Sequence, residues 1–273
     1  ISDAADDPSV LAIKMTLYRT GKDSPIVAAL ERAARNGKQV VVLVELKARF
    51  DEERNIAWAN QLENAGVTVI YGLKNLKVHA KIIMVMRREN DTVRRYAHLA
   101  TGNYNPKTAK LYSDLSIFTG NSEIVNDATL FFNLVTGYST LQSMKQLDMA
   151  PVTLKSKLLS MIQREIDRSD PEHPGLIMAK MNALTHEEVI EALYKASQAG
   201  VKVLLNVRGV CMLVPGVPGL SENIKVISIV DRYLEHSRIF YFQNGGSDEI
   251  YLASADWMSR NLDRRIELMF PII

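Results

Sequence analysis

The sequence predicts two tandem α/β domains, each a mixed β-sheet with helices on both faces. Strand-like runs of branched apolar residues alternate with amphipathic helical stretches, which is the pattern of α/β proteins. The same order of segments then occurs twice along the 273 residues, as an internal duplication would give. We predict a first domain over residues 1–148 and a second over residues 149–273, the second truncated at its C-terminus.

The first copy is predicted to alternate strands and helices up to a long apolar helix. Its second strand, residues 39–46, is a continuous β-branched run, which is typical of a strand buried on both faces. Its first helix has Ser24 and Pro25 at the cap and first turn, and it ends at Gly37. The other predicted strands are 10–18, 67–71, 75–84, one ending at Leu99, and 113–118, and the other helices are 53–65 and 121–134.

Four segments of the first copy recur in the same order in the second. IKMTLY matches AKMNAL, KQVVVLV matches VKVLLNV, the strand 75–84 matches EHSRIFYF, and LATGNYN matches LASADWM. The last pair places Asp256 opposite Asn103. A boundary helix is expected between residues 142 and 169. The second copy ends soon after its final strand, and the chain starts without methionine, so we expect truncation at both ends.

Composition limits the classes of function. The chain is 47% hydrophobic and 23% charged, which favours globular domains over disorder. With 33 basic against 31 acidic residues, an anion site must come from local clustering, and a nucleic-acid partner is not expected. The single cysteine, Cys211, excludes an intrachain disulfide and fits a reducing compartment. No run approaches the roughly 20 apolar residues of a membrane span. We expect a cytoplasmic protein without a transmembrane segment, and peripheral membrane association stays open.

The strand over residues 75–84, NLKVHAKIIM, carries the main chemical signal. In a strand, Lys77, His79 and Lys81 would share one face, while Val78 and Ala80 would face the opposite, buried side. The lysines attract phosphate, and a neutral imidazole, with a usual pKa of about 6.5, can attack it. The alternative is a half-exposed strand with an incidental histidine.

The second copy repeats this arrangement, because His236 and Arg238 share a face of their strand. Two such half-sites, each followed by a small polar loop, resemble the phospholipase D superfamily. That resemblance implies one composite site at a pseudo-twofold interface, with one histidine forming a phosphohistidine and the other handling the proton. The superfamily motif has an aspartate five residues after the lysine or arginine, where this chain has Met86 and Gln243. This departure weakens a phosphodiesterase or nuclease assignment, which remains the main alternative.

A closer resemblance is to the polyphosphate kinase family. The matching motifs span almost the whole chain: LYRT, VELKARFDEE, KVHAKI, TGNYNPKTAKLYSDLS, NVRG and EHSRIFYF. The resemblance is to the carboxy-terminal catalytic half, so the amino-terminal and head regions would be missing partners. It implies reversible transfer of the ATP γ-phosphate to inorganic polyphosphate through a phosphohistidine, with Mg²⁺ arriving with ATP, ADP as product, and a homo-oligomer. Since the missing region contributes to the nucleotide base site, we expect weak ATP affinity and little activity of this chain alone.

The resemblance also assigns residues. It implies that His79 is the phosphorylated nucleophile and His236 the second essential histidine, at the nucleotide phosphates. We add Lys81 to this catalytic set, as a cation beside His79. Tyr112 and Arg208 would contact the nucleotide.

Arg19 and Arg49 would lie where the family is described as binding magnesium. A guanidinium has no lone pair to offer a metal, so we expect these arginines to grip phosphate oxygens instead. From the residues themselves we add Arg265, in the last strand, as a phosphate ligand, and Asp114 as a group that orients an imidazole.

Simpler interpretations stay open for these residues. Arg19 and Arg49 could end surface strands, Tyr112 could pack under a strand, and Asp114 could be a turn residue. Three further histidines are predicted to be structural or exposed: His98, His173 and His186. A third function, different in class, is a non-catalytic fragment that binds polyanions.

Overall fold

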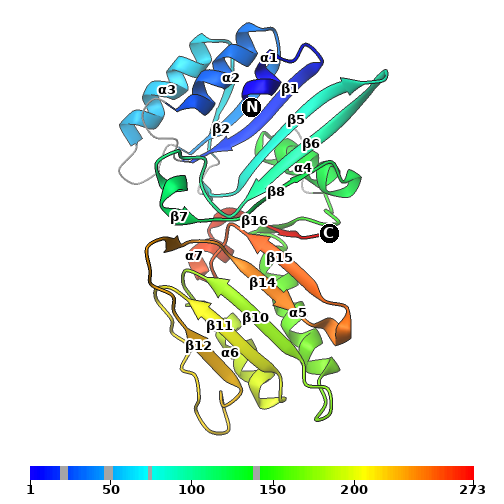
Figure 1. The fold of residues 1–273 in the computed structure, drawn as a ribbon, viewed down its shortest axis with the longest axis vertical. Helices are drawn as coiled ribbons and strands as arrows, with labels where there is room; N and C mark the ends of the chain where they lie inside the picture. Colours follow the sequence, from blue (N-terminus) through cyan, green and yellow to red (C-terminus); the bar gives the residue numbers. More distant parts are fainter. Residues whose placement is uncertain (19–23, 46–51, 73–75, 138–141) are drawn as a thin grey trace. The chain divides into compact units, whose positions relative to one another are not determined.

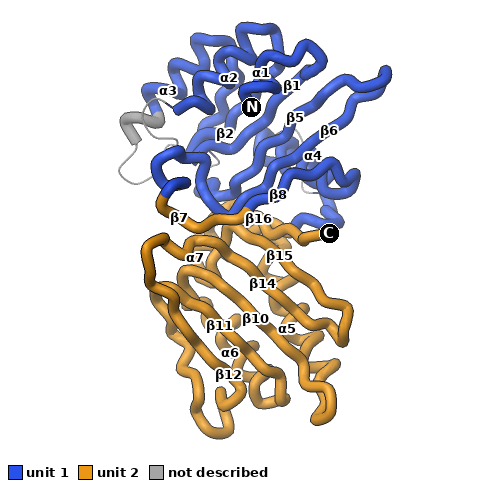
Figure 2. The backbone as a smooth tube through the Cα atoms, in the orientation of Figure 1, with its two compact units in different colours: residues 1–110, 116–147 blue, residues 111–115, 148–273 orange. Residues whose placement is uncertain are grey.

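The computed structural model describes residues 1–18, 24–45, 52–72, 76–137 and 142–273. Two compact units make up the chain (Figure 2). The first contains Ile1–Lys110 and Ser116–Leu147, and the second contains Leu111–Leu115 and Asp148–Ile273. The main boundary between the two units lies between residues 147 and 148, next to the boundary predicted between residues 148 and 149. In addition, the short segment Leu111–Leu115 belongs to the second unit.

A mixed sheet forms the centre of the first unit, with strand order β3-β2-β1-β5-β6-β8 (Figure 1). β1, β2 and β3 are parallel, whereas β5, β6 and β8 continue the sheet in antiparallel fashion. The strands are β1 Val10–Leu17, β2 Gln39–Val44, β3 Thr68–Tyr71, β5 Lys81–Glu89, β6 Thr92–Ala100 and β8 Ser116–Thr119. Asn90 and Asp91, both with positive φ, form the tight turn between β5 and β6.

Helices cover both faces of this first sheet, as predicted. The helices are α1 Ser2–Asp6, α2 Pro25–Arg35, α3 Glu52–Asn64 and α4 Ser122–Val135, with a 3₁₀ turn η1 at Thr108–Lys110. Ile83 of β5 packs in the same cluster as Val27 and Leu30 of α2, whereas its neighbour Met84 contacts Thr129 of α4. Because adjacent strand residues point to opposite faces, α2 and α4 cover opposite sides of the sheet.

The second unit repeats the same connection of strands. Its sheet runs β12-β11-β10-β14-β15-β16, again with three parallel strands followed by antiparallel ones, and β9 pairs with β16. The strands are β9 Asp148–Ala150, β10 Leu176–Met181, β11 Lys202–Val207, β12 Ile224–Ile227, β14 Ile239–Phe242, β15 Glu249–Ala253 and β16 Arg265–Pro271. The predicted duplication and the two mixed sheets are therefore confirmed.

The helices of the second unit are distributed differently. They are α5 Leu154–Arg168, the predicted boundary helix, α6 Glu187–Gln198 and α7 Ser259–Leu262, with a 3₁₀ turn η2 at Asn244–Gly246. α5 and α6 pack on one face of the sheet, against residues such as Phe240 and Phe242. The opposite face carries partly exposed Met178, Leu204 and Ile227 around a hollow of about 520 Å³. Among the described residues, the prediction of helices on both faces therefore fails over this part of the second sheet.

Both histidine strands are interrupted at the histidine, which corrects the continuous strands predicted there. In the first unit β4, Lys77–Val78, ends before His79, and β5 begins at Lys81. Oγ1 of Thr16 on β1 donates a hydrogen bond to the Ala80 carbonyl at 2.7 Å and accepts one from the Ile82 amide at 3.2 Å. A side chain thus replaces part of the sheet's hydrogen bonding at this break.

In the second unit β13, Leu234–Glu235, ends before His236, and β14 begins at Ile239. The predicted strand 113–118 is also divided, because β7 comprises Tyr112–Ser113 and β8 starts at Ser116. β7 pairs in parallel with β13, so Asp114 and Tyr112 accompany the His236 segment. None of the described helices is long and apolar enough to cross a bilayer.

Candidate active site

His79 lies at the break between β4 and β5 of the first unit. The Tyr18 ring meets its imidazole edge-on, with ring centroids 5.1 Å apart and planes at 90°. Just before it, the Val78 amide donates to Oε2 of the buried Glu45 at 2.9 Å. Thr16 of β1 binds the carbonyl of Ala80, and Glu45 at the end of β2 binds the amide of Val78. The residues on either side of His79 are thus held in place, which fixes the position of the histidine.

Lys81 belongs to the same half-site but is not the exposed cation that strand alternation predicts. Its side chain is 2% exposed, and its Nζ donates to the carbonyl oxygen of His79. Nζ also lies 5.7 Å from the centre of the Tyr18 ring. Lys81 therefore contacts the backbone of the histidine itself.

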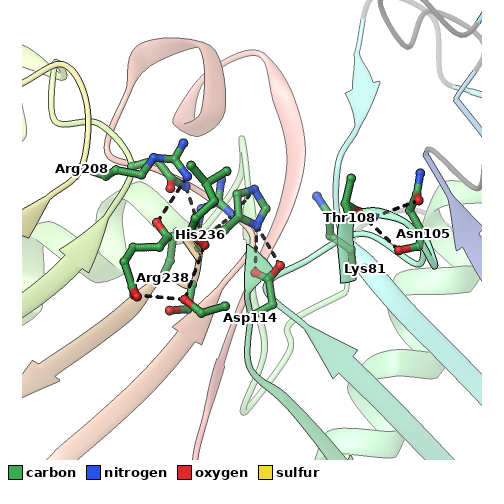
Figure 3. Close-up of polar contacts among 12 residues, drawn as sticks. Lys81, Asn105, Thr108, Asp114, Arg208, His236 and Arg238 are labelled. Carbon is green, nitrogen blue, oxygen red and sulfur yellow. Dashed lines mark hydrogen bonds and ion pairs between the residues drawn. The ribbon is translucent and has the colours of Figure 1, made fainter. Parts of the chain in front are cut away.

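The second half-site is built around His236 (Figure 3). Its Nδ1 lies 2.8 Å from Oδ1 and 3.0 Å from Oδ2 of Asp114. An ionised carboxylate can only accept, so Nδ1 carries a proton and donates it. The Tyr112 ring lies beside the imidazole, with centroids 5.0 Å apart. Asp114 thus forms a hydrogen bond with an imidazole, and Tyr112 contacts the same ring.

Arg238 lies against the face of the His236 ring. Its Nη1 is 3.2 Å from Nε2 and 3.4 Å from Nδ1, and an atom nearly equidistant from both nitrogens lies over the ring and not on the lone-pair axis of either. The same Nη1 donates to the His236 carbonyl at 3.0 Å. A guanidinium readily stacks on a flat ring in this way.

A buried carboxylate holds Arg238 in place. Asp256 accepts from Nε at 3.1 Å and from Nη2 at 3.2 Å, and both side chains are almost wholly buried. Oδ1 of Asp256 also accepts from the amide and the side-chain nitrogen of Asn182, at 2.8 and 3.0 Å. Sequence reasoning placed Arg238 on this face but assigned it no role, and it did not select Asp256 or Asn182. The alignment of Asp256 with Asn103 was a signal that could have drawn attention to Asp256.

Arg208 is the other predicted nucleotide ligand brought to this half-site. Its Nη1 donates to the Glu235 carbonyl at 3.3 Å. Burial is the main cause that lowers its pKa from the usual value, followed by the positive charge of Arg238. Two guanidinium groups beside one imidazole favour an anionic ligand such as phosphate.

Glu235 and Lys180 form a further ion pair next to His236, with Nζ of Lys180 3.1 Å from Oε2. Oγ of Ser113 also donates to Glu235 at 3.0 Å. The hydrogen bond from Lys180, and then that from Ser113, lowers the pKa of Glu235. The pair ties β10 to the β7 and β13 segments, and sequence reasoning did not predict it.

The structure places the remaining predicted residues less completely. Arg265 is the first residue of β16 and is partly exposed. Arg19 and Arg49 lie outside the described residues. No group of three or more His, Cys, Asp or Glu side chains within the described ranges could hold a metal ion. Asp114, Glu235 and Asp256 each accept hydrogen bonds from a cationic side chain or an imidazole, so this donor set does not fit a magnesium site built by the protein alone.

The other three histidines have contacts that suit structural or surface roles. His98 hydrogen bonds through Nδ1 to the Tyr104 hydroxyl at 3.0 Å and contacts the Phe118 ring at a tilt of 46°, and burial lowers its pKa to about 4. His186 is the residue just before α6, and its Nε2 lies 3.2 Å from Oδ2 of Asp263. His173 is exposed and lies 3.5 Å from Asp170.

Two family models together match all of the chain except residues 142–146. The model described as "Polyphosphate kinase C-terminal domain 1" matches residues 1–141, and "Polyphosphate kinase C-terminal domain 2" matches residues 147–273. The chain belongs to the polyphosphate kinase family. The predicted resemblance to that family is therefore confirmed.

Individual members of the polyphosphate kinase family agree with this result. The polyphosphate kinase of Rhodopirellula baltica is 59% identical over 273 residues, which are 100% of this chain and 32% of that protein. The crystal structure of polyphosphate kinase from Porphyromonas gingivalis superposes with a TM-score of 0.90 at 41% identity, covering 100% of this chain and 44% of that one. The chain thus spans less than half the length of these relatives.

More distant structures show the fold alone. The phosphatidylserine synthase of Haemophilus influenzae superposes with a TM-score of 0.64 at 10% identity, covering 98% of this chain and 78% of that one. That structure shares the fold of this chain, and the predicted fold of two tandem α/β domains, each with a mixed sheet, is confirmed.

Proposed function

We propose that this chain carries the phosphoryl-transfer steps of a polyphosphate kinase. The reaction is reversible transfer of the γ-phosphate of ATP to the end of an inorganic polyphosphate chain, through a phosphohistidine at His79. The observation that carries the proposal is the repeated half-site: each unit interrupts the same strand at a histidine and places a cation, Lys81 or Arg238, on that histidine's carbonyl. Membership of the polyphosphate kinase family supports the choice of phosphotransferase over phosphodiesterase.

His79 acts as the nucleophile in two steps. A neutral imidazole nitrogen attacks the γ-phosphorus, so that a P–N bond forms as the P–O bond to ADP breaks and ADP leaves with its electron pair. An oxygen of the terminal phosphate of polyphosphate then attacks the same phosphorus, and the P–N bond breaks. The other ring nitrogen keeps its proton throughout. Running these steps backwards regenerates ATP.

His236 serves the phosphate groups of the nucleotide. Because Asp114 holds the proton on Nδ1, the nitrogen of His236 that can exchange a proton with a phosphate group is Nε2. From there the ring can donate a hydrogen bond or a proton to a phosphate oxygen and take it back in the reverse reaction. Asp114 keeps the ring in one orientation and one tautomer.

Cationic side chains provide most of the stabilisation of the transition state for phosphoryl transfer. Charge builds up on the equatorial oxygens of the transferred phosphoryl group, and positioned guanidinium groups neutralise it. We assign Arg208 and Tyr112 to the nucleotide. We assign Arg265 to phosphate. Arg19 and Arg49 keep the same assignment on the basis of family resemblance.

Magnesium reaches the site as part of the substrate, the magnesium–ATP complex. A phosphate-bound Mg²⁺ keeps several waters and needs few protein ligands. This agrees with the site's carboxylates, which already accept hydrogen bonds from a cationic side chain or an imidazole. The family resemblance also suggests a homo-oligomer, in which regions outside this chain complete the nucleotide base site. The single cysteine and the use of ATP favour the cytoplasm.

The test is polyphosphate synthesis from ATP by the protein as its gene encodes it. We expect His79→Ala and His236→Ala to abolish synthesis, whereas His173→Ala, which alters an exposed histidine of the second unit, keeps it. Synthesis that survives in His79→Ala would contradict the proposal. Hydrolysis of a phosphodiester without polyphosphate synthesis would favour a phosphodiesterase. Binding of polyphosphate without phosphoryl transfer would favour a non-catalytic binding module.

A further inference from the structure

The backbone of His236 lies outside the regular sheet. β13 ends at Glu235 and β14 begins at Ile239, so the regular strand pairing leaves out His236, Ser237 and Arg238, and the Ala253 amide of β15 still donates to the Arg238 carbonyl at 3.2 Å. On the amide side, the Ser113 carbonyl accepts from the His236 and Ser237 amides at 3.3 and 2.9 Å. The His236 carbonyl must be held by other groups, because a buried carbonyl needs a partner.

Two side chains donate to that carbonyl. Nη1 of Arg238 does so at 3.0 Å, and Nδ2 of Asn182 does so at 3.3 Å. Arg238 comes from the segment just before β14, and Asn182 follows the last residue of β10. Together they fix where the backbone of His236 lies relative to the neighbouring strand.

Asp256 holds both of these donors. Its two carboxylate oxygens accept hydrogen bonds from Nε and Nη2 of Arg238, and Nη1 is directed at the His236 carbonyl and ring. Its Oδ1 takes the amide and side-chain nitrogens of Asn182. A carboxylate that grips a guanidinium with both oxygens fixes its orientation as well as its place.

The first copy explains why a carboxylate stands at this position. There, Nζ of Lys81 donates to the carbonyl of His79, the same contact that Arg238 makes with His236, each donor being two residues after its histidine. The aligned loop residue in that copy is Asn103. A guanidinium is planar, so its orientation must be fixed for one particular nitrogen to reach the carbonyl. An ammonium is a compact charge with rotatable donors, and it needs no carboxylate to fix its orientation. The exchange of Lys for Arg therefore accompanies an exchange of Asn for Asp.

We propose that Asp256 is a positioning residue for His236, acting through Arg238 and Asn182. This inference rests on the proposed function, because it gives Asp256 a role in positioning His236 for phosphoryl transfer and no role in binding substrate. Loss of the carboxylate lets the guanidinium rotate and releases the His236 carbonyl, so that the imidazole no longer meets the phosphate in the productive geometry. Displacements of about 1 Å at a reacting group cost roughly 100-fold in rate.

The test uses the protein as its gene encodes it, with kcat and KM for magnesium–ATP measured in polyphosphate synthesis, together with the thermal midpoint. We expect Asp256→Asn to lower kcat by about 10- to 100-fold while KM changes little. Asp256→Glu, which restores a carboxylate for Arg238, should recover part of kcat. The matched control is Glu249→Gln, which breaks another bidentate pair with an arginine, Arg164, at the opposite end of β15 from Ala253.

A double variant separates positioning from stability. Asp256→Asn leaves the charge of Arg238 buried without its partner, which should lower the thermal midpoint. The double variant Asp256→Leu with Arg238→Met removes both buried charges. It should therefore raise the midpoint again toward the wild-type value, while kcat stays low. Recovery of kcat together with the midpoint would overturn the proposal, as would a kcat for Asp256→Asn equal to that of Glu249→Gln.

A direct measurement covers failure of the proposed function itself, which would appear as a wild-type protein that makes no polyphosphate. In that event the inference is tested by the ¹⁵N resonances of the His236 ring. These resonances are assigned by their disappearance in His236→Ala. We expect Asp256→Asn to shift or broaden them, and Glu249→Gln to leave them in place. Resonances that Asp256→Asn leaves unchanged would overturn the inference.

Discussion

Nδ1 of His236 donates a hydrogen bond to Asp114 at 2.8 Å, although 122 positions separate the two residues in the sequence. The contact arises because Leu111–Leu115 leaves the first unit and pairs, as β7, with the segment that precedes His236. The carboxylate therefore reaches the imidazole from the sequence of the first copy, while the histidine comes from the second.

Asp114→Asn should leave the protein folded and lower kcat for polyphosphate synthesis by about 100-fold, the scale of a positioned acid or base. The amide can donate as well as accept, so it no longer fixes the proton on Nδ1. The matched control is Asp170→Asn, which alters an exposed Asp–His pair with His173. Equal rates for the two variants would mean that the Asp114 contact has no catalytic role.

Thr16→Val tests the break in the strand that carries His79. The hydroxyl donates to the Ala80 carbonyl and accepts from the Ile82 amide, and valine leaves both groups buried without it. We expect unfolding in denaturant to show a loss of about 1–3 kcal/mol, together with a lower kcat. Thr136→Val, which removes a hydroxyl at the end of α4, is the control for stability. If Thr16→Val lost stability but kept the wild-type kcat, the hydroxyl would not position His79.

Asn121→Ala tests the start of α4. The Asn121 side chain accepts from the Glu123 and Ile124 amides, so its loss should cost about 1 kcal/mol of unfolding free energy. Ser24 occupies the same position before α2, but its buried hydroxyl has no hydrogen-bond partner among the described residues. Ser24→Ala should therefore change the stability very little. A larger loss for Ser24→Ala than for Asn121→Ala would contradict this account of the two helix starts.

The stability of the chain should fall as the pH decreases from 6.5 to 4. Burial lowers the pKa of His98 from 6.5 to about 4, so between these values the unfolded chain binds more protons than the folded one. Unfolding free energy then rises with pH in this window, by at most about 1.4 kcal/mol per pH unit. His98→Gln should flatten the slope, and His173→Gln should not. An unchanged slope in His98→Gln would assign the acid sensitivity to other groups.

Most of the fold could be predicted from the sequence because its local signals agree with one another. The β-branched run became β2 between two parallel strands, and Pro25 and Asn121 mark the starts of α2 and α4. The order of repeated segments also predicted the repeated sheet. Alternation could not predict the breaks at His79 and His236, because they depend on side chains such as Thr16 that come from a neighbouring strand.

The candidate site could be predicted only in part, for the same reason. Motifs selected the histidines, and the place of Asp114 after Tyr112 suggested its role. The Asp256–Arg238 pair and the burial of Lys81 follow from tertiary contacts across strand ends, which no local pattern records. Exposure of one face of the second sheet is also invisible to periodicity, since Met178 and Leu204 look like core residues.

The most direct test of the central claim is to incubate the protein, as its gene encodes it, with magnesium and γ-labelled ATP and to locate the label. The account predicts an acid-labile, base-stable phosphoryl group on the peptide that contains His79, absent in His79→Ala and retained in His173→Ala. Label on the 273-residue chain alone would show that its two units contain the phosphoryl-transfer groups. A protein that makes polyphosphate while His79 never becomes labelled would contradict the account and favour direct transfer.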